Sequence, residues 1–237
     1  MSSRFRRIQR YVLAPGAALV VALGTITVPA VSANAAERRA SVSVFHAIST
    51  GMGADVVDVY ADGARIINNL KSGQLTNIRV RPGTYDIEIF LDGELPKRDE
   101  PVLALDDVTF LSGFCSTLTA NLTETGEPTA EVFANRSARN PVGTGRVTVR
   151  HIAEAPPVDV AAGGQVIFGN LANGASATKR VGVDTYPITV ALADSDTTVL
   201  GPTNLVVSRP FNTIVYAWGS AADGTLALKV QRIPVIR

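Results

Sequence analysis

The stretch Val57-Asp58-Val59-Tyr60-Ala61-Asp62-Gly63 decides the fold, because the chain contains it twice. It returns at residues 158–164 as Val158-Asp159-Val160-Ala161-Ala162-Gly163-Gly164. Residues 57–90 align with residues 158–191 without a gap, at a constant offset of 101 residues and with 14 identities in 34 pairs. Such similarity over an ungapped stretch indicates an internal duplication. We therefore expect two related domains of about 100 residues each, a common domain size.

Each copy has the pattern of short β-strands separated by turns. Val57, Val59 and Ala61 alternate with Asp58 and Tyr60, which is typical of a strand with one buried face. The Asp62-Gly63 pair that follows is a hairpin signal. Comparable runs recur throughout the chain, and no stretch of helical period and length follows residue 35. The sequence therefore predicts an all-β fold made of two tandem β-sandwich domains.

The N-terminus has the three parts of an export signal. Residues 1–10 carry four arginines and no acid, residues 11–32 are apolar, and Ala33-Asn34-Ala35 is a typical cleavage site. We expect a signal peptide over residues 1–35, export by the general secretory route, and a protein that is secreted or held in the cell envelope. A retained membrane anchor is the alternative, because the apolar stretch approaches the roughly 20 residues that span a bilayer.

Composition sets the remaining domain boundaries. The segment 137–144 is polar and contains Pro141 and Gly143, so it is predicted to be a linker. The first sandwich is then expected over residues 36–136 and the second over residues 145–237.

The charge balance and the cysteine count narrow the classes of partner. Removing the four arginines of residues 1–35 from 22 basic residues leaves 18 against 21 acidic residues, a net charge of about −3. Nucleic acid is therefore a poor candidate partner. The single Cys115 cannot form an internal disulfide and is expected to be a buried small side chain, with a reactive thiol or an intermolecular bridge as the alternative.

Cofactors are not predicted. No Cys or His cluster has zinc spacing. The acidic pairs Asp106-Asp107 and Asp194-x-Asp196 could offer oxygen ligands to calcium, but short acidic pairs in turns are also ordinary solvated surface.

The motifs shared by the two halves resemble a family of bacterial domains. They are a strand ending in His46 or His151, then Val-Asp-Val-x-x-x-Gly, then Asn-Leu-x-x-Gly, then Thr-Tyr. This order is similar to the domain-of-unknown-function family 4397, which often occurs as tandem copies in exported or cell-surface proteins. The resemblance covers about residues 40–134 and 145–231, and the second half departs from it at Gly163 and at residues 182–184. It implies immunoglobulin-like or transthyretin-like sandwiches, and it brings no catalytic residues. Separately, we expect no membrane span in this chain after signal cleavage.

The two histidines occupy equivalent positions, and so do two aspartates. His46 and His151 each end a strand on its valine face, and Asp58 and Asp159 lie on the following strand. One hypothesis is a His–Asp pair that activates a nucleophile. The other is a buried histidine held by a carboxylate or a backbone carbonyl, because an unpaired buried polar group is costly. We favour the structural interpretation, in which each aspartate ties strand ends together.

Four aromatic residues are candidates for structural or ligand contacts. Tyr85 and Tyr186 begin equivalent strands after a turn, which resembles the tyrosine corner of sandwich domains; carbohydrate stacking is the alternative. Tyr60 lies opposite the valine face and is replaced by Ala161 in the second half, so it is a candidate ligand contact of the first domain. Trp218 is either part of the core or an exposed platform for a ligand.

These observations favour an exported, non-enzymatic protein that acts as a binding or structural module of the cell envelope or the extracellular space. Cell-wall polysaccharide and another envelope protein are the candidate partners. A carbohydrate- or peptidoglycan-binding protein with a defined groove is the alternative, and a secreted hydrolase that uses His46 or His151 is a third hypothesis.

Overall fold

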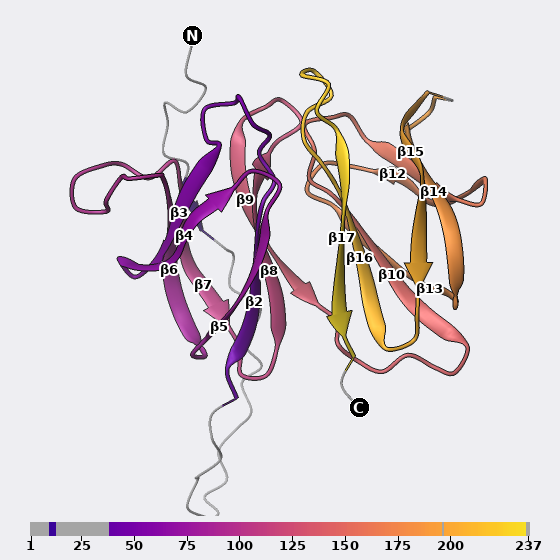
Figure 1. The fold of residues 1–237 in the computed structure, drawn as a ribbon, viewed down its shortest axis with the longest axis horizontal. Coiled ribbons are helices and arrows are strands. Elements are labelled where there is room, and N and C mark those ends of the chain that lie inside the picture. The colour runs from indigo at the N-terminus through magenta and orange to yellow at the C-terminus, as the bar shows by residue number, and fades with distance from the viewer. Residues whose placement is uncertain (1–9, 13–37, 196, 236–237) are drawn as a thin grey trace, which may run out of the picture.

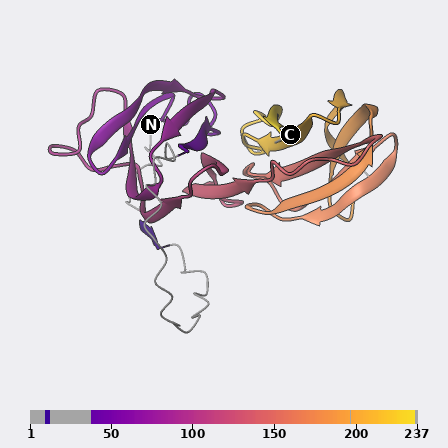
Figure 2. The same ribbon diagram turned by 90° about the horizontal axis from the view of Figure 1, so that it is seen from below.

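In the computed structural model, which describes residues 10–12, 38–195 and 197–235, each copy of the duplicated segment lies in its own β-sandwich (Figures 1 and 2). The first sandwich is built from eight strands: β2 (Ala40–His46), β3 (Val56–Ala61), β4 (Ala64–Lys71), β5 (Leu75–Val80), β6 (Gly83–Leu91), β7 (Leu103–Phe110), β8 (Cys115–Leu122) and β9 (Pro128–Asn135). One of its sheets has the order β7-β6-β3-β4 and the other has the order β5-β2-β8-β9.

The second sandwich repeats this topology strand for strand. Its strands are β10 (Thr144–His151), β11 (Val158–Ala162), β12 (Gln165–Leu171), β13 (Ser176–Gly182), β14 (Asp184–Leu192), β15 (Thr198–Val207), β16 (Phe211–Trp218) and β17 (Ala227–Pro234). The sheet orders β12-β11-β14-β15 and β13-β10-β16-β17 match those of the first sandwich. In each domain the first strand pairs in parallel with the seventh, β2 with β8 and β10 with β16. The all-β tandem-sandwich prediction is confirmed.

A further short strand, β1 (Arg10–Val12), pairs in parallel with β7 at the edge of one sheet. It falls inside the predicted signal peptide. The predicted cleavage site after Ala35 lies outside the described residues.

The duplicated stretch has the same backbone in both copies. Asp62 and Gly63 both have positive φ angles, 49° and 72°, as a two-residue hairpin turn between β3 and β4 requires. Gly163 and Gly164 adopt the same conformation, with φ angles of 57° and 82°. The turn predicted at Asp62-Gly63 is therefore confirmed. Glycine at residue 163 therefore preserves the turn conformation at a position where the second half departs from the family pattern.

Each sandwich has an apolar core between its two sheets, and a third cluster joins the domains. The first core includes Val42, Val59 and Ile89, and the second includes Val149 and Val160. The buried members of all three clusters lie between residues 40 and 233. Both cores are thus supplied by the chain after the predicted signal peptide. The described residues contain no helix that could cross a membrane.

Two predicted strand boundaries differ from the structure for one physical reason, the β-bulge. The sequence indicates that a strand ends near Ile67, but β4 continues to Lys71 through a register shift opposite β3. Likewise, the polar pair Asp106-Asp107 predicts a break between strands at residues 102–105 and 108–110, but β7 is continuous and Asp107 takes a positive φ of 59°. A bulge absorbs the polar residues without ending the strand.

Candidate functional site

The two sandwiches meet face to face through aromatic side chains. Phe45 of β2 packs edge-on against Tyr216 and Trp218 of β16, with ring centroids 5.2 and 5.6 Å apart. Phe45 and Tyr216 are fully buried. Such edge-to-face pairs add stabilisation beyond the area that they bury. The contact therefore fixes one domain against the other, a property that the sequence does not predict.

A chain of hydrogen bonds crosses the same interface. Gln231 of β17 donates from Nε2 to Ser43 Oγ at 2.7 Å, and its Oε1 accepts from Thr117 Oγ1 at 3.2 Å and from Tyr216 Oη at 2.6 Å. Ser43 Oγ in turn donates to Asn77 Oδ1 at 2.6 Å. The bonds from Gln231 to Ser43 and to Thr117 cross between the domains, and the bonds to Tyr216 and Asn77 hold their partners in place within each domain. Together they fix the register of one sheet on the other as well as the distance between them.

Arg150 is the cation at the centre of this interface. Its side chain is only 2% exposed, and it donates from Nη1 to Tyr216 Oη at 2.7 Å and from Nη2 to Asn135 Oδ1 at 2.8 Å. The guanidinium also lies over the Phe133 ring, 4.4 Å from its centroid. Burial lowers the pKa of Arg150 and raises that of Tyr216. Both shifts result from removing polar groups from water, so their hydrogen bonds are needed to offset that cost.

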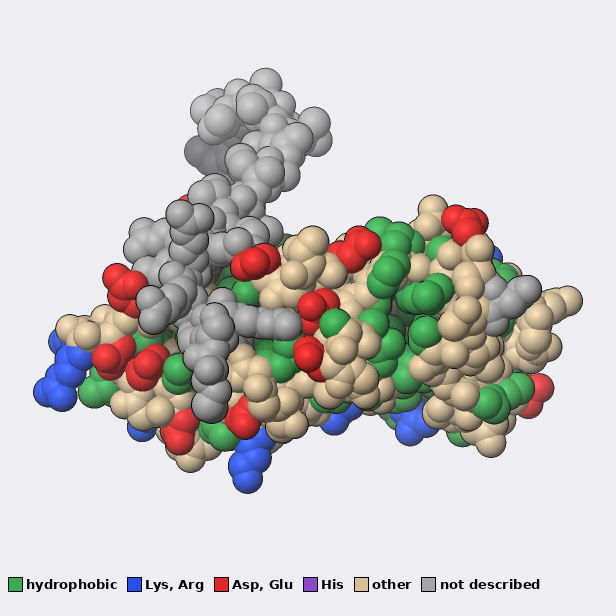
Figure 3. All heavy atoms as spheres, turned by 90° about the horizontal axis from the view of Figure 1, so that it is seen from above, with side chains coloured by type: hydrophobic (Ala, Val, Ile, Leu, Met, Phe, Trp, Pro, Cys, Tyr) green, Lys and Arg blue, Asp and Glu red, His purple; other side chains and the backbone are tan. Residues whose placement is uncertain are grey.

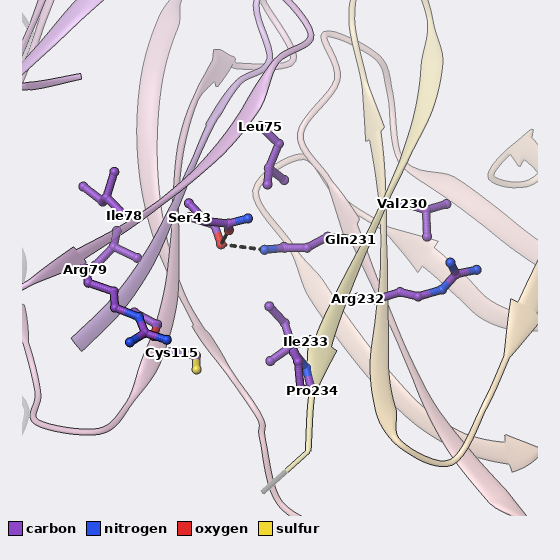
Figure 4. Close-up of a pocket in the computed structure, with 13 residues that line it drawn as sticks. Ser43, Leu75, Ile78, Arg79, Cys115, Val230, Gln231, Arg232, Ile233 and Pro234 are labelled. Atoms are coloured by element: carbon purple, nitrogen blue, oxygen red, sulfur yellow. Dashed lines mark hydrogen bonds between the residues drawn. The ribbon is translucent and has the colours of Figure 1, made fainter. Parts of the chain in front are cut away.

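A cleft of about 490 Å³ opens beside this network, between the two domains (Figure 4). Strands β2, β5 and β8 of the first domain and β17 of the second line it. Polar groups in the lining include Asn77, Arg79, Gln231 and Arg232, and they alternate with apolar side chains such as Ile78. Figure 4 shows that the Arg232 side chain points away from the cleft, so Arg79 supplies its guanidinium group. A cleft of mixed polarity with one such group can bind a polar or anionic molecule by hydrogen bonding. It is the candidate binding site of the described chain.

Cys115 also lines this cleft and is a free, half-buried thiol. The prediction of a buried side chain is therefore only partly right, because the residue begins β8 at the mouth of the interface rather than inside a sandwich core.

The two histidines are fully buried and bond to backbone carbonyls. His46 Nε2 lies 2.6 Å from Ala54 O, and His151 Nε2 lies 3.0 Å from Pro156 O. In both domains the contact closes the loop that follows the histidine strand. Burial lowers the pKa of both imidazoles. The structure thus puts a carbonyl where the catalytic hypothesis needs a carboxylate.

The two aspartates hold the bulge of the duplicated stretch. Asn69 and Asn170 have positive φ angles of 55° and 50°, and their amides bond to Asp58 Oδ1 at 2.8 Å and to Asp159 Oδ1 at 2.7 Å. Asp58 also bonds to Arg65 at 3.1 Å. The carboxylates therefore tie neighbouring strands together, which explains why Val-Asp-Val and Asn-Leu recur as a pair.

The two tyrosines that follow turns bond to nearby backbone. Tyr85 Oη donates to Arg81 O at 2.9 Å and Tyr186 Oη donates to Gly182 O at 3.1 Å, in both cases four residues back along the chain. This is the geometry of a tyrosine corner.

The two candidate ligand contacts are packed against protein. Tyr60 is 4% exposed and meets Phe90 edge-on at 5.4 Å. Trp218 is half-buried at the domain interface, where a Cβ on Gly73 would come within 3.0 Å of its ring. Neither residue lines the cleft. Gly73 is thus required both for its positive φ of 73° and for the approach of Trp218.

The connection between the domains is attached to the second sandwich. Residues 136–143 join β9 to β10, and Asn140, 1% exposed, donates from Nδ2 to Arg209 O and Phe211 O, both at 3.0 Å. The predicted linker is thus held to the protein surface by specific bonds.

Sequence reasoning missed the residues that join the domains, above all Arg150 and Gln231. Arg150 occupies the strand position next to His151, on the face opposite Val149, and its counterpart in the first domain is Phe45. The available signal was the long cationic side chain of Arg150 within a strand in which valines alternate with polar residues. Within the described ranges, no group of three or more His, Cys, Asp or Glu side chains is placed to hold a metal ion.

Comparison with known proteins shows which family the chain resembles. A family model described as "Domain of unknown function (DUF4397)" matches residues 40–161, slightly more than half of the chain. No curated protein matches the chain. A solved structure, "The Bacillus anthracis TIE protein", aligns with 84% of this chain at 7% sequence identity and a TM-score of 0.26, and the chain spans 32% of that protein's length. A likeness at this level carries no argument about the present chain.

Proposed function

The chain belongs to the family of the domain of unknown function DUF4397, and from this premise we propose that it is an exported, non-enzymatic binding or structural module of the cell envelope. In this proposal the tandem sandwiches act as one rigid body. Ligand contacts come from surfaces that need both domains, the interdomain cleft first among them.

The observation that carries the proposal is the buried interface between the sandwiches. Gln231 of the second domain bonds to Ser43 and Thr117 of the first. Arg150 bonds across the interface to Asn135, and Phe45 packs in the apolar cluster between the two domains. A polar network of this kind rigidifies an interface when its members are satisfied. Two domains fixed in this way present a cleft of constant shape, as a pre-organised binding site requires.

A second argument concerns the residues that catalysis would use. His46, His151, Asp58 and Asp159 each form bonds that stabilise loops or bulges, and both domains use them in the same way. Duplication of a structural bond is expected from duplication of a fold. We therefore assign these residues to stability rather than to a hydrolase site.

The test is co-sedimentation of residues 36–237 with isolated cell walls and with insoluble polysaccharides. The chosen variant is Arg79→Ala with Asn77→Ala, since both side chains are exposed and line the cleft. The matched control is Arg98→Ala, an exposed arginine in the loop between β6 and β7.

Saturable pelleting that the cleft variant weakens at least tenfold, and that the control leaves unchanged, supports the proposal. Pelleting with purified polysaccharide alone favours the glycan-binding alternative. Hydrolysis of wall material that His46→Gln abolishes while the protein stays folded contradicts the non-enzymatic assignment.

A further inference from the structure

The exposed arginines of the two sandwiches gather at one end of the molecule. Ala40 pairs with Val80, and Ser41 pairs with Cys115, so the chain segments beyond these residues share an end of the first domain. In the second domain, Thr144 pairs with Gly182 in the same way. We call the resulting surface the arginine end; it consists of the turns at residues 38–39, 81–82, 111–114, 136–143, 182–184 and 208–210.

The charges at this end are strongly one-sided. Its exposed arginines are Arg38, Arg39, Arg81, Arg136, Arg139 and Arg209. Asp184 is the one acidic residue of these turns among the residues that the structure describes. Seen from above, the opposite end shows Asp and Glu side chains spread over its surface and Lys and Arg at its margins (Figure 3). The net charge of the whole chain conceals this separation.

Mutual repulsion joins Arg136 of the arginine end to two arginines on the adjoining strands, Arg146 of β10 and Arg180 of β13. Buried Arg146 donates from Nη1 to Ala138 O at 3.1 Å, and its pKa is lowered by burial and further by the charges of Arg180 and Arg136. Among the described side chains, no carboxylate lies within ion-pair distance of these three arginines. An unneutralised cluster of guanidinium groups is complementary to phosphate, which arginine binds in a bidentate manner.

The same end carries apolar side chains at the tips of its turns. Val142 is 81% exposed, Phe114 60%, Leu111 55% and Val183 49%. The turn between β7 and β8 and the connection between β9 and β10, which hold three of them, lie along the lower edge of the molecule in Figure 1. Because these residues belong to both sandwiches and the domains are fixed by their interface, the apolar tips form one constant arrangement.

We propose that the arginine end is a docking surface for an anionic phospholipid bilayer. The four apolar tips enter the interfacial region of the membrane, and the arginines around them bind lipid phosphates. A soluble phosphate polymer would satisfy the arginines alone, since it offers no apolar phase for Phe114 and Val142.

The test is flotation of residues 36–237, a chain that contains both cores, with vesicles of phosphatidylcholine alone or mixed equally with phosphatidylglycerol. A cooperative thermal unfolding transition first shows that each variant is folded. We expect binding to the anionic vesicles and weakening with added salt, because exposed charges are screened. Each arginine near an anionic membrane contributes roughly fivefold to partitioning, so Arg136→Gln with Arg139→Gln and Arg209→Gln weakens binding about 100-fold.

The apolar tips have their own variant and control. Phe114→Ser with Val142→Ser removes two exposed side chains and is expected to weaken vesicle binding about tenfold at constant charge. Leu95→Ser with Val166→Ser, 41% and 58% exposed away from the arginine end, leaves binding unchanged.

Three outcomes overturn the proposal: no binding to anionic vesicles, equal binding to phosphatidylcholine, or loss with the arginine variant but not with the tip variant. Binding to soluble polyphosphate as tight as that to vesicles identifies a phosphate polymer instead and also overturns it. This inference concerns the sandwich ends, so its failure leaves the cleft and the wall-binding test unaffected.

Discussion

Replacing Arg150 with alanine tests the claim that the two sandwiches form one rigid body. The residue is a buried cation of β10 that donates to Tyr216 Oη at 2.7 Å and Asn135 Oδ1 at 2.8 Å and lies over Phe133 at 4.4 Å. Two of these three partners belong to the other domain. The variant therefore removes the contacts that Arg150 makes between the domains and leaves the two sandwich cores intact.

The magnitude follows from these contacts. Each hydrogen bond to a charged group contributes about 1.5–3 kcal/mol, and a desolvated cation–π contact contributes about 2 kcal/mol. Part of this loss is recovered, because the variant no longer has to move a guanidinium charge out of water on folding. We expect a net loss of about 3–5 kcal/mol, typical of a broken buried polar network. Arg150→Met retains apolar volume without the charge, so its cost is expected to be smaller.

The assay is calorimetric unfolding of wild type, Arg150→Ala, Arg150→Met and the exposed control Arg180→Ala on the neighbouring strand β13. Wild type should unfold in one transition, and Arg150→Ala should separate it into two as the domains become independent. The control should stay within about 0.5 kcal/mol of wild type. A loss below about 1 kcal/mol for Arg150→Ala, with a single transition, would refute the reasoning.

Two further predictions concern the duplicated residues. Burial lowers the pKa of His46 and His151, so on acidification the unfolded chain binds protons before the folded chain does. The stability that the two neutral histidines contribute is therefore fully present above about pH 6.5 and is lost as the pH falls through their pKa values in the folded state. Urea unfolding between pH 8 and pH 5 measures this, and the double variant His46→Gln with His151→Gln should flatten the dependence; an unchanged slope contradicts the assignment. Asp58→Ala should cost about 1.5–3 kcal/mol through the lost bond to the Asn69 amide, and Asp159→Ala less, because its bond to Asn170 is exposed to water. Thermal unfolding of both variants checks the order, with Asp58→Asn as the control that keeps an acceptor oxygen, and no change in Asp58→Ala rules out a role for the carboxylate in the bulge.

Several features of the fold could be predicted from local patterns. Alternation of Val57 and Val59 with Asp58 indicated a strand, and Asp62-Gly63 indicated its turn, since these signals depend only on side-chain period and on the φ angle of a short segment. The bulge at Asn69 could not be read in this way. Its stability comes from Asp58, eleven residues away, so the strand appeared to end early.

The candidate site was less accessible to sequence reasoning. Tyr60 is a candidate ligand contact in the sequence because the second half has Ala161 at the equivalent position. In the structure its ring packs against Phe90 instead. The cleft, by contrast, combines β5 with β17, and Gln231 meets Ser43 across a separation of 188 residues. Pairings at that distance in the chain leave no periodic signal.

The sequence by itself therefore determined the duplication, the strands and turns of each sandwich, and the family to which the chain belongs, because each depends on neighbouring residues or on the repeat. Only the tertiary structure decided how the sandwiches face each other, which polar groups the interface buries, and where the charges lie. Arg136, Arg146 and Arg180 are dispersed in a chain of nearly balanced charge. They become one cluster because β10 pairs with β13 so that Arg146 lies opposite Arg180, and because the connection that holds Arg136 folds back to bond with Arg146.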